Sequence, residues 1–282
     1  MRVLLLGASG MLGHAVYKDL REKYDLTITT RKAKKDLLGE IDCRYLEFDV
    51  ARLLDDATSK RWEYFPRFVE AVGDVDYVVN AIGVINIFAN RDPANSFFVN
   101  AALPHILARQ YKTRLIHIST DCVYDAGPSG PYDENAPLAP KDLYGVTKSL
   151  GEPKDCLTIR TSIIGQELDS RGSLIDWFLH QPTDKPISGY TNHLWNGITT
   201  RQYARVCDKV MSARISKAGV FHVFTNVVSK YDMLIAFRKK FGIRCEIVPV
   251  EANPPVDRRL STIYDFNSWL QIPSFEQMVE EM

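Results

Sequence analysis

The stretch Arg2-Val3-Leu4-Leu5-Leu6-Gly7-Ala8-Ser9-Gly10-Met11-Leu12-Gly13 decides the fold of this chain. Its apolar first half has the composition of a buried strand, and its glycines lead into a helical pattern over residues 11–23. Glycines permit a tight turn and let a pyrophosphate approach the backbone, while the start of the helix offers unpaired N–H groups. A plain strand–helix turn would also use glycine, but strand, loop and helix together favour a dinucleotide site. We expect this site to be lined by Gly7, Ser9, Gly10, Met11, Leu12 and Gly13.

The alternation of strands and helices continues through the first half of the chain. Apolar strands are predicted at residues 2–6, 26–30, 44–48, 75–81, 114–119 and 156–161. Helical patterns lie near residues 11–23, 64–73, 95–111 and 142–152. Continuously apolar strands that alternate with helices predict an α/β fold, a Rossmann-type doubly wound parallel sheet with helices on both faces.

The regular alternation ends near residue 161. Two further helices are predicted at residues 172–181 and 200–213, and turn residues are frequent in segments 182–199 and 242–262. We therefore expect a Rossmann domain over residues 1–161, with a later return to it near 197–225. Residues 162–282 are expected to form mostly a smaller C-terminal substrate-binding lobe.

Composition limits the range of functions. The chain has 282 residues, and its 35 basic side chains balance 35 acidic ones, so nothing suggests nucleic acid or an anionic membrane as a partner. No apolar run of this sequence approaches the roughly 20 residues of a membrane span. The five cysteines, at positions 43, 122, 156, 207 and 245, are scattered without metal-binding or redox spacing. These features predict a soluble protein with reduced thiols in the cytoplasm and no metal site.

The end of the second predicted strand bears on the choice of nicotinamide. An acidic residue about 20 positions after the glycine loop would bind the ribose 2′-hydroxyl of NAD, but this chain has Arg31 and Lys32 there. Both would neutralise the 2′-phosphate of NADP, although an ordinary basic loop would look the same. We therefore expect NADPH as the cofactor, with NADH as the alternative. The next two strand ends would complete the cofactor site, with a carboxylate near the adenine and small residues along the backbone, through Asp49, Val50, Asn80, Ala81 and Gly83.

A tyrosine and a lysine are the candidates for the chemistry. Tyr144 stands four residues before Lys148, so the two side chains share one face of a predicted helix. An ammonium beneath the phenol would favour its ionised form and move its pKa from about 10 toward neutral pH. Thr120 follows the preceding strand, where its hydroxyl would bind Tyr144 and a substrate carbonyl. Together these residues predict an acid that protonates a carbonyl oxygen while a hydride reaches the carbon.

Three motifs in this region resemble a known family. They are Ser119-Thr120-Asp121-Cys122-Val123-Tyr124, then Pro131-Tyr132-Asp133-Glu134, and Leu143-Tyr144-Gly145-Val146-Thr147-Lys148 followed by Gly151-Glu152. They resemble extended short-chain dehydrogenase/reductases, and most closely the dTDP-4-dehydrorhamnose reductase-like nucleotide-sugar reductases. The resemblance covers most of the first 165 residues and is looser beyond them.

The resemblance implies a reaction and its partners. It implies that NADPH reduces the 4-keto group of a nucleotide-activated 6-deoxyhexose in the synthesis of surface-polysaccharide precursors. Thr120, Tyr144 and Lys148 would be the catalytic residues, with Tyr144 and Lys148 also contacting the cofactor. The nucleotide sugar would bind in the C-terminal part of the chain, and the resemblance allows a homodimer.

Cys122 leaves a second enzymatic function open. Dehydratases similar to this chain carry an Asp-Glu pair after the threonine, whereas this chain has Asp121 followed by Cys122 and so lacks the base for water loss. Epimerase–reductases of the same group use a cysteine at this position, so an epimerising reductase stays open beside the interpretation of Cys122 as a small packed side chain. A third alternative is a non-catalytic NADP-binding regulatory subunit, which keeps the fold while controlling a partner enzyme.

The remaining candidates would bind the substrate. Arg160 and Arg259 carry guanidinium groups that suit a diphosphate, although an ion pair with an acidic side chain is equally ordinary. Trp195 would stack on a nucleotide base or pack inside the lobe. The predicted substrate site therefore comprises Asp121, Cys122, Arg160, Trp195 and Arg259.

Overall fold

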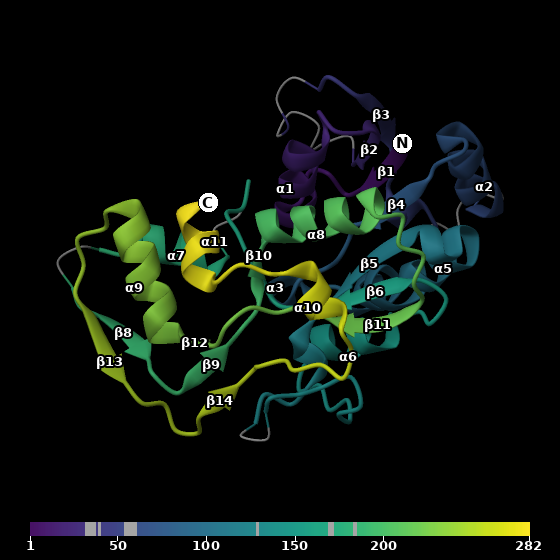
Figure 1. The fold of residues 1–282 in the computed structure, drawn as a ribbon. Coiled ribbons are helices and arrows are strands. Elements are labelled where there is room, and N and C mark those ends of the chain that lie inside the picture. The colour runs from purple at the N-terminus through teal and green to yellow at the C-terminus, as the bar shows by residue number, and fades with distance from the viewer. Residues whose placement is uncertain (32–37, 39–40, 54–60, 128–129, 169–171, 183–184) are drawn as a thin grey trace.

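The apolar strands pair into one seven-stranded parallel sheet with the order β11-β6-β5-β4-β1-β2-β3 (Figure 1). The computed structural model describes residues 1–31, 38, 41–53, 61–127, 130–168, 172–182 and 185–282. The strands of this sheet are β1 (Arg2–Leu6), β2 (Asp25–Thr30), β3 (Arg44–Glu47), β4 (Tyr77–Asn80), β5 (Leu115–Ser119), β6 (Leu157–Arg160) and β11 (Gly219–His222). The chain runs outward from β1 to one edge and then restarts at β4 toward the other, so the order of the strands reverses between β1 and β4. Ligands of open α/β sheets bind at such a switch point, outside the carboxyl ends of the strands.

Alternate residues of the central strand face two separate cores. Val3 and Leu5 pack with helices α1 (Met11–Leu20) and α8 (Thr200–Ser212), which lie side by side on one face of the sheet (Figure 1). Leu4 and Leu6 pack with α2 (Arg61–Val72) and α5 (Leu103–Tyr111) on the other face. All four strand residues are fully buried, which explains why β1 reads as a continuous apolar run rather than an alternating one.

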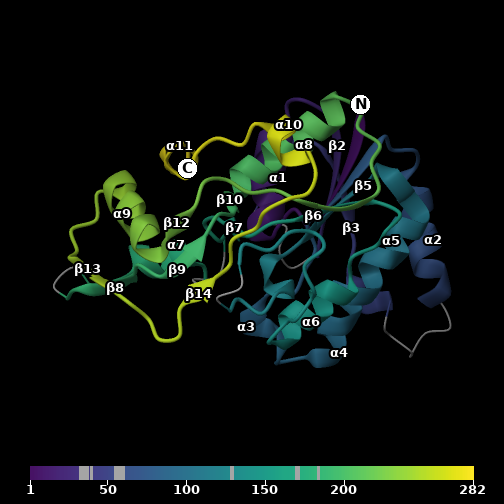
Figure 2. The ribbon, with the colours of Figure 1, turned by 60° about the horizontal axis from the view of Figure 1, so that its bottom comes forward.

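Short helices lie at the carboxyl ends of β4 and β5. Figure 2 shows α3, α4 and α6 grouped at this side of the molecule. The helices and helical turns of this region are α3 (Asn86–Ala89), α4 (Pro93–Phe97), η3 (Phe98–Ala102), η5 (Asp121–Val123) and α6 (Leu143–Leu150). Two further helical turns are η2 (Val50–Leu53), which follows β3, and η4 (Lys112–Arg114), which directly precedes β5.

The C-terminal part of the chain forms a lobe beside the sheet, built on short strands. Three small sheets pair β10 with β7, β12 with β9 and β14, and β13 with β8. Its elements are β7 (Ile163–Ile164), α7 (Leu174–Leu179), β8 (Ile187–Tyr190), β9 (His193–Trp195), β10 (Ile198–Thr199), β12 (Val228–Ser229), α9 (Lys230–Phe241), β13 (Ile247–Val250), β14 (Val256–Asp257) and α11 (Phe275–Glu280). The helix α10 (Phe266–Leu270) instead packs on β11 and in the core of the large sheet. The lobe has its own apolar core, in which Phe178, Phe237 and Phe275 are completely buried. None of the helices in the described residues is long and apolar enough to span a membrane.

The predicted α/β, Rossmann-type fold is confirmed, and the predicted strands lie within two residues of the observed ones. The predicted helix at residues 95–111 is different, because it is divided into α4, the π-helical turn η3 and α5. Pro104 has no N–H to donate to the carbonyl of Asn100, which is the bond an uninterrupted α-helix would make. The wider turn therefore falls at Asn100, a buried polar residue near the site described next.

Candidate active site

The glycine loop lies at the switch point between β1 and β4. Gly7 has a φ of +83°, a conformation that a residue with a side chain rarely adopts. Gly13 is excluded from carrying a side chain for a different reason, since a Cβ there would lie 2.0 Å from the carbonyl oxygen of Gly7. Thr29 at the end of β2 holds the loop from the other side, because its Oγ1 accepts from the N–H of Gly7 at 3.1 Å. The loop is therefore a rigid, close-packed turn.

The start of α1 offers its N–H groups to an anion. Its N-cap is Gly10, no side chain caps the helix, and the first turn contains no acidic residue. Uncapped N–H groups at a helix start are a site for phosphate. Of the predicted lining residues, Ser9 and Met11 are half-buried and Gly10 is exposed, whereas Leu12 packs into the core. The backbone here thus fits the pyrophosphate of a dinucleotide.

The next two strand ends lie along the same edge of the sheet. Arg31 is exposed directly after β2, and Lys32 lies outside the described residues. Asp49 is half-buried, and its Oδ1 accepts from the N–H of Ala51 at 3.1 Å, so the carboxylate caps the turn η2. Val50 is buried in the core. Arg31 is thus a cation at the position where a 2′-phosphate would lie.

Two buried asparagines hold the loop that follows β4. Asn80 accepts from the N–H of Ile82 at 3.1 Å and donates to His117 Nδ1 at 3.1 Å, so the turn through Ala81 is fixed to β5. Asn100 bonds both the N–H and the C=O of Val84 at 2.9 Å, which fixes the loop beyond Gly83. Asn100 is not among the residues predicted from the sequence. The feature that could have identified it is a single amide side chain within the apolar run Phe97-Phe98-Val99-Asn100-Ala101.

Tyr144 and Thr120 meet between β5 and α6. The helix begins at Asp142, whose Oδ1 accepts from the N–H of Gly145 at 2.7 Å, so Tyr144 lies in its first turn. Burial raises the pKa of Tyr144, and the neighbouring Cys122 and Asp121 raise it further, while a hydrogen bond with Thr120 acts in the opposite direction. The sequence-based expectation that Lys148 moves this pKa toward neutral is therefore wrong for the chain by itself. The phenol stays protonated at neutral pH, which is the form an acid needs.

Lys148 is buried beneath this pair, with only 4% of its surface exposed. Its Nζ donates to the carbonyl oxygen of Ile118 on β5 at 2.6 Å. Burial lowers the pKa of Lys148 to about 8, and the carboxylate of Glu152 partly offsets this effect. The ammonium is thus held against β5 and is poised to lose its proton in mildly alkaline solution.

Asp121 and Cys122 face an arginine that the sequence analysis did not select. Arg258 Nη1 donates to Cys122 Sγ at 3.2 Å and lies 3.8 Å from Asp121 Oδ2. Burial raises the pKa of the Cys122 thiol to about 12, and Asp121 adds to this effect. Arg258 directly follows β14, so only the folded lobe brings it beside Asp121 and Cys122. No local sequence signal distinguishes Arg258 from Arg259.

Three predicted substrate residues are used elsewhere. Arg160 is buried and pairs with Glu152, with Nη2 and Oε2 2.6 Å apart, so it is not available to a diphosphate. Arg259 pairs with Asp257 in the same way, again at 2.6 Å. Trp195 is 8% exposed and packs edge-on against Phe275 in the lobe core. Each of the three residues thus already has a buried or ionic partner, and their assignment to the substrate stays a prediction.

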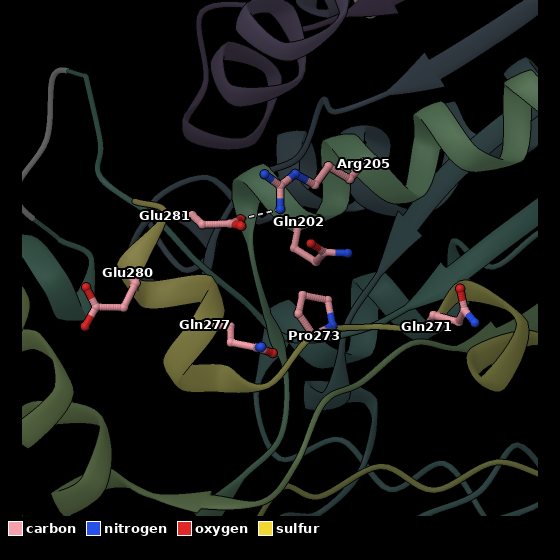
Figure 3. A pocket seen from close by; sticks show the side chains of 7 residues that line it. All are labelled: Gln202, Arg205, Gln271, Pro273, Gln277, Glu280 and Glu281. Carbon is pink, nitrogen blue, oxygen red and sulfur yellow. Dashed lines mark hydrogen bonds and ion pairs between the residues drawn. The ribbon is translucent and has the colours of Figure 1, made fainter.

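A hollow of about 540 Å³ lies away from these residues, between α8 and the C-terminal segment (Figure 3). Arg205 and Glu281 form an ion pair at its rim. It is lined by Gln202, Arg205, Gln271, Pro273, Gln277, Glu280 and Glu281, none of which is a predicted site residue. Within the described residues, no group of three or more His, Cys, Asp or Glu side chains is arranged to hold a metal ion.

Comparison with known proteins agrees with this geometry. Residues 1–263 match the model of the RmlD substrate binding domain. The chain is 25% identical over 260 residues to the spore coat polysaccharide biosynthesis protein SpsK of Bacillus subtilis, covering 88% of this chain and 82% of SpsK. It is 31% identical over 172 residues to a dTDP-4-dehydrorhamnose reductase of Burkholderia thailandensis, covering 57% of this chain and 50% of that protein.

Two further likenesses cover nearly the whole chain. Methionine adenosyltransferase 2 subunit beta of Danio rerio is 25% identical over 279 residues, covering 90% of this chain and 78% of that protein. The structure of dTDP-4-dehydrorhamnose reductase from Bacillus anthracis in complex with NADP superposes with a TM-score of 0.73 at 20% identity, over 99% of this chain and 97% of that one. The family match over residues 1–263 shows that the chain belongs to the RmlD substrate binding domain family.

Proposed function

We propose that this protein is an NADP-dependent oxidoreductase that reduces the 4-keto group of a nucleotide-activated 6-deoxyhexose. The observation that carries the proposal is that α6, with Tyr144 and Lys148, packs against the turn η5 that follows Thr120, and that Lys148 Nζ donates to the carbonyl oxygen of Ile118 at 2.6 Å. Residues 1–161 and the return through α8 and β11 would bind the cofactor, and most of residues 162–282 would bind the sugar nucleotide. The name of SpsK supports a role in polysaccharide synthesis, and the name of the Burkholderia enzyme supports reduction of a nucleotide sugar. We propose that this reaction takes place in the cytoplasm.

The residues present fit the cofactor. The uncapped start of α1 would bind the pyrophosphate, the loop held by Asn80 and Asn100 would contact the nicotinamide half, and Arg31 would neutralise the 2′-phosphate. When bound, NADPH supplies the hydride that reduces the ketone. Lys148, which is directed at the end of β5, would bind the nicotinamide ribose.

The protein's own residues handle the proton. The raised pKa of Tyr144 keeps its hydroxyl protonated, so it can donate to the oxygen of the carbonyl as negative charge develops there. The hydroxyl of Thr120 would orient that carbonyl by a hydrogen bond. Thr120 also acts to lower the pKa of Tyr144, so it favours the phenolate that remains after proton transfer.

A group of basic side chains in the lobe would bind the diphosphate of the substrate. The pairing of β9 with β12 and β14 brings together His193, Lys230 and Arg258. Burial lowers the pKa of His193, and the charges of Lys230 and Arg258 lower it further, so the imidazole is neutral at neutral pH. No ion pair or side-chain hydrogen bond of Lys230 occurs within the described residues. Lys230 and Arg258 repel each other, and this repulsion is relieved when an anion binds between them.

Epimerisation by Cys122 is less well supported. An epimerising base must take a proton from a carbon next to the ketone, which requires the thiolate. The pKa of about 12 keeps the thiol protonated at neutral pH, although Arg258 stabilises the thiolate. A simple reductase therefore fits the site better.

A non-catalytic regulatory role is the second candidate, because the likeness to methionine adenosyltransferase 2 subunit beta covers 90% of the chain. Against it, Thr120, Tyr144 and Lys148 are all present, and α6 packs against the turn that follows Thr120. NADPH binding without turnover, together with a co-purifying synthetase, would favour the regulatory role.

The decisive experiment measures NADPH oxidation with a panel of enzymatically generated 4-keto-6-deoxy nucleotide sugars. Each product is identified by NMR in deuterated water. We expect turnover with at least one sugar and no deuterium at C3 or C5. Deuterium at either carbon would instead indicate an epimerising reductase, and no turnover with any sugar would contradict the proposal.

A further inference from the structure

Two consecutive residues at the end of β5 are bonded to α6 or to the turn that ends it. Lys148 Nζ donates to the carbonyl oxygen of Ile118 at 2.6 Å. Ser119 Oγ donates to Glu152 Oε1 at 2.5 Å. The next residue, Thr120, leads into the turn η5, which packs against α6. The strand and the helix that supply the proposed catalytic residues are thus fixed to each other at two successive positions, and Glu152 supplies the one beside Thr120.

Glu152 is itself held by a buried arginine. Arg160 Nε donates to Glu152 Oε1 at 2.9 Å and Arg160 Nη2 donates to Oε2 at 2.6 Å, a two-point contact from β6. The two side chains are only 4% and 6% exposed. The carboxylate therefore has one orientation, and its remaining interaction is with Ser119. The residue before Glu152 must be glycine, because a Cβ on Gly151 would lie 1.8 Å from the carbonyl oxygen of Asn100.

Arg160 connects this pair to the rest of the molecule. Its Nη1 donates to His222 Nε2 at 3.0 Å, so His222 carries its proton on Nδ1 and donates it to the carbonyl oxygen of Ser261 at 2.7 Å. Burial lowers the pKa of His222, which agrees with a neutral ring. The same guanidinium donates to Tyr124 Oη at 2.5 Å. Arg160 is thus fully occupied, and its contacts reach the segment that follows Arg258 in the lobe.

We propose that Glu152 and Arg160 are a positioning pair, which holds Ser119 and hence Thr120 in register with Tyr144 and Lys148. The proposal rests on the proposed reduction and extends it to two residues that do not touch the substrate. Stability alone is a weak reason for such a pair, because well-packed apolar side chains often replace a buried ion pair without loss of stability. The carboxylate of Glu152, four residues after Lys148, has a second effect, because it raises the pKa of the Lys148 ammonium.

Lys148 has few charged neighbours. Glu152 is the acidic group that raises its pKa against the effect of burial. His117 on β5 also faces Lys148, but burial lowers the pKa of His117 well below its usual range, so that ring is neutral. Arg160 lies behind Glu152 on β6. Removal of Glu152 therefore leaves the Lys148 ammonium with no nearby counter-charge among the described residues.

The test separates positioning from stability. The variants are Glu152→Gln, Arg160→Met and the double variant Glu152→Leu/Arg160→Met, with Asp208→Asn as the control. Asp208 on α8 forms an ion pair at 2.7 Å with Lys23, which follows α1. The control therefore also removes one charge of an ion pair. Each single variant leaves an unpaired buried partner and is expected to unfold at lower temperature, whereas the double variant should recover most of that loss.

Activity should not recover with stability. We expect the double variant to keep a kcat about 100-fold below the natural protein, with KM for the sugar changed less than about threefold, because misplacing catalytic groups by about 1 Å costs that much. The control should retain full activity. Recovery of kcat in the double variant would mean that the pair serves stability alone. If the single and double variants all fail to fold, the pair is a structural element and the proposal is wrong.

A second measurement does not depend on turnover. NMR titration of 13C-labelled lysine should place the midpoint of Lys148 below its value of about 8 in Glu152→Gln and in the double variant, and unchanged in Asp208→Asn. An unchanged midpoint in all variants would contradict the proposal even if the enzyme reduces a keto sugar. A lowered midpoint in a protein that turns over no keto sugar would instead contradict only the proposed reaction.

Discussion

The Rossmann half and the C-terminal lobe present their functional residues in different ways. In the Rossmann half, each candidate follows a strand of one sheet, as Gly7 follows β1 and Thr120 follows β5. The strands of the lobe have only two to four residues, and its proposed substrate-binding residues come from three segments joined by the pairing of β9 with β12 and β14. In the proposed function, the chemistry depends on local sequence order, whereas binding of the sugar nucleotide depends on long-range pairing. Variants of the catalytic residues in the first half should therefore change kcat, and variants of the lobe should change KM for the sugar.

The largest expected effect comes from Tyr144. Tyr144→Phe removes the acidic hydroxyl but keeps the ring, so kcat should fall about 1,000-fold, within the range of general acid catalysis. NADPH affinity, measured by fluorescence titration, should stay within a few-fold of the natural value. Phe98→Leu serves as a control for packing, because it changes an apolar side chain in η3 and removes no polar group. A Tyr144→Phe variant that works at the natural rate would remove Tyr144 from the mechanism.

The second expected effect concerns Lys148 and pH. An unfolded lysine titrates near 10.5 and the folded Lys148 near 8, so between these values the unfolded chain holds the extra proton. The contribution of Lys148 to the free energy of unfolding is therefore constant below pH 8 and rises with pH above it, by on the order of 3 kcal/mol in total. Catalysis should change in the opposite direction, because it uses the charged form.

Urea unfolding of the natural protein and of Lys148→Met at pH 7 to 10 measures this contribution as a difference between the two curves. The difference should shift in favour of the natural protein above pH 8, while its kcat declines with a midpoint near pH 8. Parallel stability curves would show that Lys148 titrates normally. Such a result would also mean that burial does not lower the pKa of Lys148 in the folded protein.

The same contrast explains how much the sequence could predict. The order of strands and helices, the glycine loop and the set of Thr120, Tyr144 and Lys148 follow from patterns within a few residues of each other, so they were accessible. Arg258 and Arg259 are adjacent in sequence, and only the pairing of β14 directs the first toward Cys122 while the second pairs with Asp257. The burial of Arg160 could not be predicted either, because its hydrogen-bond partners lie 8 to 62 positions away in the sequence.

The third expected effect tests the lobe. Arg258→Met should raise KM for the nucleotide sugar about 10- to 100-fold, the loss that accompanies one or two charge-assisted hydrogen bonds. Because Arg258 lies outside the proton-transfer contacts, kcat should change less than about threefold. Arg259→Met is the matched control, since it removes the same charge from the next residue but faces Asp257. Equal effects of the two variants on KM would contradict the assignment of Arg258 to the diphosphate.

The smallest expected effect concerns Arg31, which should affect binding of the cofactor to the Rossmann half and not binding of the sugar to the lobe. Arg31 is exposed, so its contact with a 2′-phosphate is partly screened by solvent and contributes about 1 kcal/mol. Arg31→Ala should therefore raise KM for NADPH about fivefold, leave KM for NADH unchanged, and leave KM for the sugar unchanged. Arg109→Ala removes another exposed arginine, on α5, and should affect neither cofactor. Equal losses for NADPH and NADH would show that Arg31 contributes only general positive charge. A change confined to the sugar would break the separation between the halves, because a residue of the Rossmann edge would then act on the ligand of the lobe.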